Sequence, residues 1–80
     1  MQEEQRLHEL DIGEIATIRE IQSAQLPAKF FELGFFPGSK IQIKHKAPFN
    51  GPICVSILDN NALVAIRRTE AQHITTTSLS

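Results

Sequence analysis

The sequence has 80 residues, which fits one small domain and leaves no room for a cleft between two lobes. Eight basic and nine acidic residues give a formal net charge of −1, so no overall field attracts nucleic acid or anionic lipid. A single cysteine excludes an internal disulfide, and the sequence shows no signal-peptide pattern and no run of ~20 apolar residues. We expect a cytoplasmic protein, which would serve any membrane process from the aqueous side.

The first residues are polar. Residues 1–6 lack apolar periodicity and predict a flexible start. The first apolar anchors are Leu7, Leu10 and Ile12. The segment Asp11–Glu14 predicts a turn in which Gly13 takes positive φ.

A first strand is expected over Glu14–Ile21, where β-branched residues dominate. Ala16 and Ile18 share one face of this strand, but Ile21 is out of phase with them. We therefore predict a bulge near Arg19–Glu20, which gives the curvature that a small barrel needs.

A short helix is predicted after Pro27, which suits a first helical turn. Its apolar stripe would consist of Leu26, Phe30 and Leu33, at helical spacing. Gly34 occupies the position of a left-handed C-cap, and the next residue, Phe35, is then expected to pack on Phe30. The segment Phe36–Ser39 predicts a type II turn, with proline and glycine at its central positions.

The rest of the chain predicts β-structure. Lys40–Ala47 alternates isoleucines with lysines, as in a half-buried strand, and residues 48–52 predict a loop. Further strands are expected at Ile53–Ile57, Ala62–Ile66 and His73–Thr77, with a hairpin turn at Asp59–Asn61 and one helical turn at Thr69–Ala71. The prediction is a mainly β, partly open barrel of about five strands with one short α-helix, over residues 7–77, followed by a loose tail at residues 78–80.

Residues that could support chemistry are scattered. His8, His45, His73 and Cys54 lie in different segments and share no metal-ligand spacing, although a composite metal site is the alternative. Cys54 is interpreted as a partly buried, inert thiol. No phosphate-binding glycine motif is present. We expect neither an enzyme nor a bound cofactor.

A set of basic residues has two interpretations. Its members are Lys40, Lys44, Lys46, Arg67 and Arg68. The first interpretation is a solvated strand face, and the second is a surface for nucleic acid. No aromatic residue interleaves with them as base stacking would require, so the first is preferred.

The aromatic residues are the best candidates for function. An 80-residue core need not bury all five phenylalanines, and an exposed apolar patch on a small domain commonly marks a protein-binding surface. The predicted partner-binding residues are Leu26, Phe31, Phe35, Phe36 and Phe49. Core packing is the alternative for each.

Several strings then occur in a recognisable order. They are Leu7, Leu10, Gly13, Ala16 and Ile18, then LGFFPG at Leu33–Gly38, then Ala47-Pro48 and Gly51-Pro52-Ile53, then VAIRR at Val64–Arg68, with Ala71 and Ile74. This order resembles the bacterial ferrous iron transport protein A (FeoA) family, from Leu7 to about Thr76. Two positions depart from the family pattern. Gly51 stands where an acidic residue is common before the proline, and Ile66 replaces a leucine.

The resemblance implies an SH3-like barrel that acts as a cytosolic accessory of the membrane ferrous iron transporter B, whose cytoplasmic part binds GTP. The resemblance assigns no catalytic residue to this sequence, and the family has no settled metal site that could be assigned. The same module resembles the C-terminal domain of iron-dependent transcriptional repressors, which makes a small regulatory or nucleic-acid-binding module the alternative function. A third hypothesis is weak self-association through an apolar patch.

Overall fold

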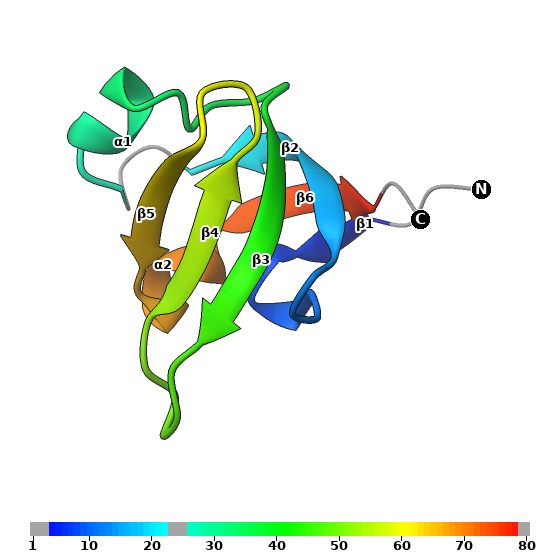
Figure 1. Cartoon of the computed structure of the whole chain (residues 1–80), viewed down its shortest axis with the longest axis vertical. Helices are drawn as coiled ribbons and strands as arrows, with labels where there is room; N and C mark the ends of the chain where they lie inside the picture. The colour runs from blue at the N-terminus through cyan, green and yellow to red at the C-terminus, as the bar shows by residue number, and fades with distance from the viewer. Residues whose placement is uncertain (1–3, 23–25, 79–80) are drawn as a thin grey trace.

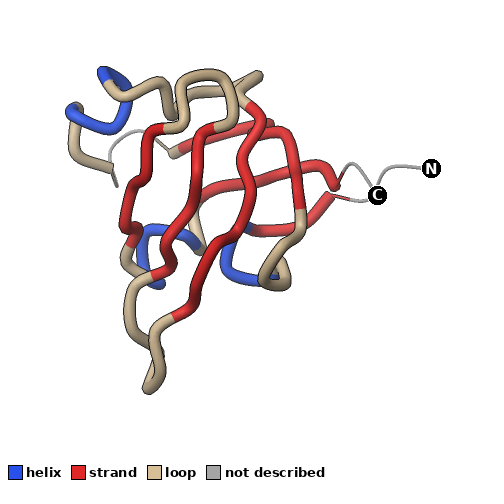
Figure 2. The backbone as a smooth tube through the Cα atoms, viewed as in Figure 1, coloured by secondary structure: helices blue, strands red, loops and turns tan. Residues whose placement is uncertain are grey.

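The computed structural model describes residues 4–22 and 26–78. Its elements, in chain order, are β1 (Glu4–Arg6), the 3-10 turn η1 (Leu7–Glu9), β2 (Ile15–Ile21), α1 (Lys29–Glu32), β3 (Lys40–Lys46), β4 (Ile53–Ile57), β5 (Ala62–Ile66), α2 (Arg68–Ala71) and β6 (Ile74–Ser78). The short helices lie at the ends of the strands, as Figure 2 shows. No helix in the described part of the chain is long and apolar enough to cross a membrane.

The strands form one antiparallel sheet in the order β1-β6-β2-β3-β4-β5. Figure 1 shows that the sheet coils, so that β3, β4 and β5 lie in front of β2, β6 and β1. The edge strands β1 and β5 do not pair with each other, and the barrel is therefore open along one side. The predicted mainly β, partly open barrel is confirmed, with six strands in the described residues instead of about five.

The additional strand lies in the predicted flexible start. Arg6 pairs with Thr75 and Glu4 with Thr77, and the Thr76 hydroxyl donates to the carbonyl oxygen of Gln5 at 2.8 Å. The prediction for residues 1–6 was thus wrong for 4–6, because the pairing strand lies about 70 residues along the chain and leaves no local pattern. Residues 1–3 lie outside the described residues.

The predicted loose tail is also partly wrong. Ser78 ends β6 and pairs with Ala16, and its hydroxyl donates to Glu14 Oε2 at 2.9 Å. Residues 79–80 lie outside the described residues. Strand β6 lies between β1 and β2 in the sheet and pairs with both. This pairing orders the C-terminal end of β6.

Two bulges curve the sheet. The register of β2 against β6 shifts between Ile18 and Glu20, which confirms the bulge predicted there. A second shift lies in β3 between Ile43 and His45, and it leaves Lys44 and His45 both exposed. The predicted alternation through Ala47 therefore fails after Ile43.

The core lies between the two halves of the coiled sheet. Its buried apolar side chains are Leu7, Leu10, Ala16, Ile18, Leu26, Phe30, Phe35, Ile41, Ile43, Ile53, Val55, Ile57, Val64, Ile66, Ala71 and Ile74. Ile12, a predicted anchor, is instead 60% exposed. The turn at Asp11–Glu14 forms as expected, with the Glu14 N–H donating to the Asp11 carbonyl at 3.0 Å, and Ile12 projects from it.

A second short helix follows β5. The sequence predicts one helical turn over Thr69–Ala71, and α2 spans Arg68–Ala71. The Arg67 N–H donates to Glu70 Oε1 at 3.1 Å, which satisfies an amide at the start of the helix. The predicted helical turn is confirmed, so the described chain has two short α-helices where one was expected.

Candidate partner-binding site

The segment of residues 26–39, here named the α1 corner, contains most of the predicted binding residues. Helix α1 ends in a Schellman motif at Gly34, whose φ is +99°. The Gly34 N–H donates to the Phe31 carbonyl at 3.1 Å, and the Phe35 N–H donates to the Phe30 carbonyl at 3.0 Å. The rings of Phe30 and Phe35 meet edge to face, with centroids 6.1 Å apart, so the predicted cap and its packing are confirmed.

The turn after this cap joins the corner to the sheet. The Ser39 N–H donates to the Phe36 carbonyl at 3.0 Å, and Gly38 has φ of +98°, as a type II turn requires. The Gly38 N–H donates to the Ile18 carbonyl at 2.8 Å, and the Ile18 N–H donates back to Ser39 at 2.9 Å. The turn therefore continues the hydrogen bonding of β2.

The turn between β4 and β5 supports the corner from the other side. The Asn60 side-chain amide donates to the Leu33 carbonyl at 2.9 Å, and the Ala62 N–H donates to Asn60 Oδ1 at 3.0 Å. Within the corner, the Ser39 hydroxyl donates to the Gly34 carbonyl at 2.6 Å. These contacts hold the end of α1 in a fixed position.

The predicted binding residues separate into buried and exposed groups. Leu26 and Phe35 belong to the core, at 7% and 0% exposure, and neither can form a binding surface. The burial of Phe35 follows from the cap, because the residue after the glycine is directed onto the helix. Phe31 is half-buried and Phe36 is 45% exposed, so these two remain surface residues of the corner.

Leu33 is a corner residue that the sequence pattern misplaces. It was assigned to the buried stripe of the helix, but its side chain is 41% exposed. Helix α1 covers only Lys29–Glu32, with Leu33 as its C-cap, so the predicted stripe from Leu26 to Leu33 is longer than the helix. Phe31, Leu33 and Phe36, within six residues of sequence, are here named the corner patch.

Phe49 is not a neighbour of the corner patch. It lies in the loop between β3 and β4. Figure 1 shows this loop at the end of the molecule opposite α1. Its side chain is 99% exposed. The predicted binding residues therefore do not all lie together, because β3 and β4 separate the two ends of the sheet.

The five basic residues do not all lie in one patch either. Lys40 begins β3 and Lys46 ends it, so the two lie at opposite ends of a seven-residue strand. Lys46 Nζ donates to the His8 carbonyl at 3.3 Å. Burial lowers the pKa of the His8 imidazole; Glu9 opposes this effect, and the positive charges of Arg68, Arg6 and Lys46 add to it.

The described residues contain no group of three histidine, cysteine or acidic side chains that could hold a metal ion. His8, His45 and His73 remain apart, and His73 Nδ1 is 3.0 Å from Gln22 Oε1. The free thiol of Cys54 is half-buried on β4.

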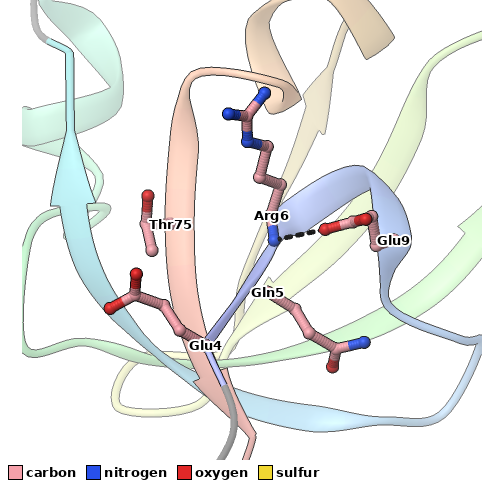
Figure 3. Close-up of a pocket in the computed structure, with 5 residues that line it drawn as sticks. All are labelled: Glu4, Gln5, Arg6, Glu9 and Thr75. Atoms are coloured by element: carbon pink, nitrogen blue, oxygen red, sulfur yellow. Dashed lines mark hydrogen bonds between the residues drawn. The ribbon is translucent and has the colours of Figure 1, made fainter.

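A shallow polar pocket of about 210 Å³ lies beside β1. Figure 3 shows its lining residues, which are Glu4, Gln5, Arg6, Glu9 and Thr75. Glu9 Oε1 accepts the Arg6 N–H at 2.8 Å, and Figure 3 shows that the Glu4 carboxylate does not converge on it. Paired acid and base groups need such convergence, so the pocket gives no support for catalysis.

Comparisons with known proteins identify the family. The model of the FeoA domain matches residues 5–77. FeoA protein from Chlorobium tepidum is 29% identical, with a TM-score of 0.81 over 95% of this chain and 71% of that one. FeoA from Stenotrophomonas maltophilia, a prokaryotic SH3 domain protein solved with zinc, is 25% identical, with a TM-score of 0.67 over 95% and 88%.

A transcriptional repressor has a similar module. A manganese-dependent transcriptional repressor is 26% identical, with a TM-score of 0.81 over 99% of this chain but only 44% of the repressor. No curated protein matches the sequence. The predicted SH3-like fold is confirmed, and because the family model covers nearly the whole chain, this protein belongs to the FeoA family, which is linked to ferrous iron transport.

Proposed function

We propose that this chain is a non-enzymatic cytoplasmic accessory protein of bacterial ferrous iron uptake. It binds the cytoplasmic GTP-binding part of the membrane ferrous iron transporter B. The observation that carries the proposal is the FeoA match over residues 5–77. The Stenotrophomonas relative, described as a candidate ferrous iron transport activating factor, supports the same role.

The surface of the domain favours protein binding. Small-molecule sites are usually concave and mostly apolar, whereas the polar pockets beside β1 are shallow. The corner patch instead offers exposed apolar side chains on a firmly held support. Phe36 is the candidate anchor, because aromatic residues at the centre of an interface contribute most of its binding energy.

The fixed geometry of the corner favours binding by Phe36. Both the cap at Gly34 and the turn at Gly38 are closed by backbone hydrogen bonds, and Asn60 attaches α1 to the β4–β5 turn. A surface that is already ordered loses little conformational entropy when a partner binds. We therefore assign the transporter contact to the corner patch.

Titration of this protein into purified transporter B, and into its separate GTP-binding domain, tests the proposal. We expect saturable binding that Phe36→Ser weakens about tenfold or more, as for loss of an aromatic anchor. Ile12→Ser is the matched control, since Ile12 is also exposed but lies in the turn before β2. Absence of binding to both forms of the transporter, with and without guanine nucleotide, would refute the assignment.

The repressor similarity supports a second candidate, a small regulatory or nucleic-acid-binding module. Such binding would depend on basic residues and weaken steeply with added salt. A gel-shift measurement at low salt distinguishes the two functions. If the protein retards DNA or RNA and added salt weakens this binding, the nucleic-acid-binding function is favoured. If the mobility of DNA and RNA is unchanged, that function is excluded.

A further inference from the structure

The β3–β4 loop, residues 47–52, presents one aromatic side chain to solvent. Phe49 is 99% exposed, more than any other large apolar residue described. Figure 1 shows the loop projecting beyond the strands, at the end of the sheet opposite α1. The ring therefore contributes nothing to the core, and the packing of the domain does not explain its presence.

The loop holds this ring in an unfavourable backbone conformation. Phe49 and Asn50 have φ of +59° and +60°, a region that bulky side chains rarely adopt. Two backbone hydrogen bonds fix it, from the Gly51 N–H to Pro48 at 3.1 Å and from the Ala47 N–H to Pro52 at 3.0 Å. The local conformation suits asparagine or glycine at position 49, so the aromatic ring is disfavoured locally as well.

A basic groove adjoins the loop. A shallow pocket of about 320 Å³ is lined by Asn50, Gly51, Pro52, Arg67, Arg68 and Thr69. Arg67 is exposed, and the buried Nε of Arg68 has no hydrogen-bond partner among the described residues. The nearby Glu70 carboxylate accepts the Arg67 backbone N–H through Oε1 at 3.1 Å.

Lys46 adds a further positive charge to this end of the molecule, because it ends β3 next to the loop. Although the whole chain carries a net charge of −1, basic groups gather here beside an exposed ring. Arginine and aromatic residues are the types enriched where protein interfaces are strongest. The groove and the ring together are complementary, in charge and in apolar character, to a partner surface that is acidic and has an apolar pocket.

We propose that Phe49, Arg67 and Arg68, here named the loop surface, dock onto an acidic protein surface that has an apolar socket for one aromatic ring. A lipid surface is a poorer match, because one ring with a few basic residues gives only weak membrane binding. Single-stranded nucleic acid usually stacks on several aromatic residues, and only one is present here. The proposal adds a second surface to the domain, separate from the corner patch.

Photo-crosslinking in the native bacterium tests this proposal. The full chain carries benzoylphenylalanine in place of Phe49, and in a control strain in place of Ile12, which is exposed elsewhere. We expect a protein adduct from position 49 only, mapped by mass spectrometry to an apolar residue flanked by aspartate or glutamate. Arg67→Glu should lower its yield about tenfold, whereas Arg19→Glu, an equal charge change on β2, should not.

Each other outcome overturns the proposal. These outcomes are a lipid or nucleic-acid adduct, an equal yield from position 12, or a yield that Arg67→Glu does not change. If Arg67→Glu fails to fold, raised salt in a cell extract replaces it and should lower the yield similarly. The loop surface and the proposed function can fail separately. An adduct between position 49 and a protein other than the transporter supports the loop surface, even if this chain does not bind the transporter. If this chain binds the transporter but position 49 gives no adduct, the loop surface is refuted and the corner patch is retained.

Discussion

Phe35 and Phe36 are neighbours in sequence but have opposite surroundings. Phe35 is fully buried against Phe30, whereas Phe36 is 45% exposed at the start of the turn. We expect Phe35→Ala to lower the free energy of unfolding by about 3–5 kcal/mol, and Phe36→Ala by about 1 kcal/mol or less. Urea denaturation measures both, and equal losses would contradict the assignment of Phe36 to the surface.

The side chain of Phe49 is expected to serve partner binding without contributing to the stability of the domain. Because its ring is unpacked and its φ is positive, Phe49→Asn should keep or raise the free energy of unfolding, by up to about 1 kcal/mol. Thermal denaturation followed by circular dichroism tests this. A substantial loss of stability would show that the ring packs in solution, and would remove the argument that it is free for a partner.

His8 should make stability depend on pH. Burial lowers the pKa of its imidazole below the unfolded value of 6.5, and its Nδ1 is buried without a hydrogen-bond partner among the described residues. The unfolded chain therefore binds a proton first, and stability is lost as the pH falls from about 6.5 toward the folded pKa. Chemical denaturation at pH 7.5 and 5.5 should show a smaller loss in His8→Gln, and an identical loss would refute the effect.

At the scale of elements, the two glycines of the α1 corner allow the stability cost of a positive φ to be distinguished from the cost of a steric contact. Gly34 and Gly38 have nearly equal positive φ, but a Cβ at Gly34 would lie 3.0 Å from Asn60 Nδ2, whereas at Gly38 nothing lies within 4 Å. Gly38→Ala should cost about 1–3 kcal/mol of stability, the conformational term alone. Gly34→Ala should cost more, because Asn60 must move and its bond to Leu33 is disturbed.

Equilibrium denaturation of both variants and the wild type gives the comparison. A cost for Gly34→Ala equal to or below that for Gly38→Ala would show that Asn60 adapts freely, and that the corner is less firmly held than its hydrogen bonds indicate.

Local signals made several elements predictable from sequence. The cap at Gly34, the turn at Gly38 and the bulge near Arg19–Glu20 each depend on residues close together in the chain. The strand Glu4–Arg6 depends on β6, and no local pattern shows it. Leu33 was misplaced because helical spacing was extended beyond a four-residue helix.

The predicted site also depends on both local signals and contacts between distant parts of the chain. The sequence predicts a surface position for Phe36, whose side chain is 45% exposed, but which other phenylalanines lie beside it depends on tertiary structure. Phe35 enters the core through its cap, and Phe49 lies at the far end of the β3–β4 hairpin. Aromatic composition can thus predict that some apolar side chains are exposed, whereas the position of these side chains depends on the fold.

At the scale of the whole molecule, the domain has different surfaces at its two ends. The corner patch lies beside α1, and the loop surface lies beyond the far ends of β3 and β4. The curved sheet between them is held by continuous antiparallel pairing from β1 to β5. Such a domain is suited to contact one partner at two places, or two partners at once.

We propose that the chain acts in ferrous iron uptake through the corner patch. The most direct measurement is the initial rate of ferrous iron uptake in a strain lacking this gene, complemented with wild type, Phe36→Ser or Ile12→Ser at equal expression. We predict that deletion lowers uptake, that wild type and Ile12→Ser restore it, and that Phe36→Ser does not. Unchanged uptake in the deletion strain, or full restoration by Phe36→Ser, would contradict the account.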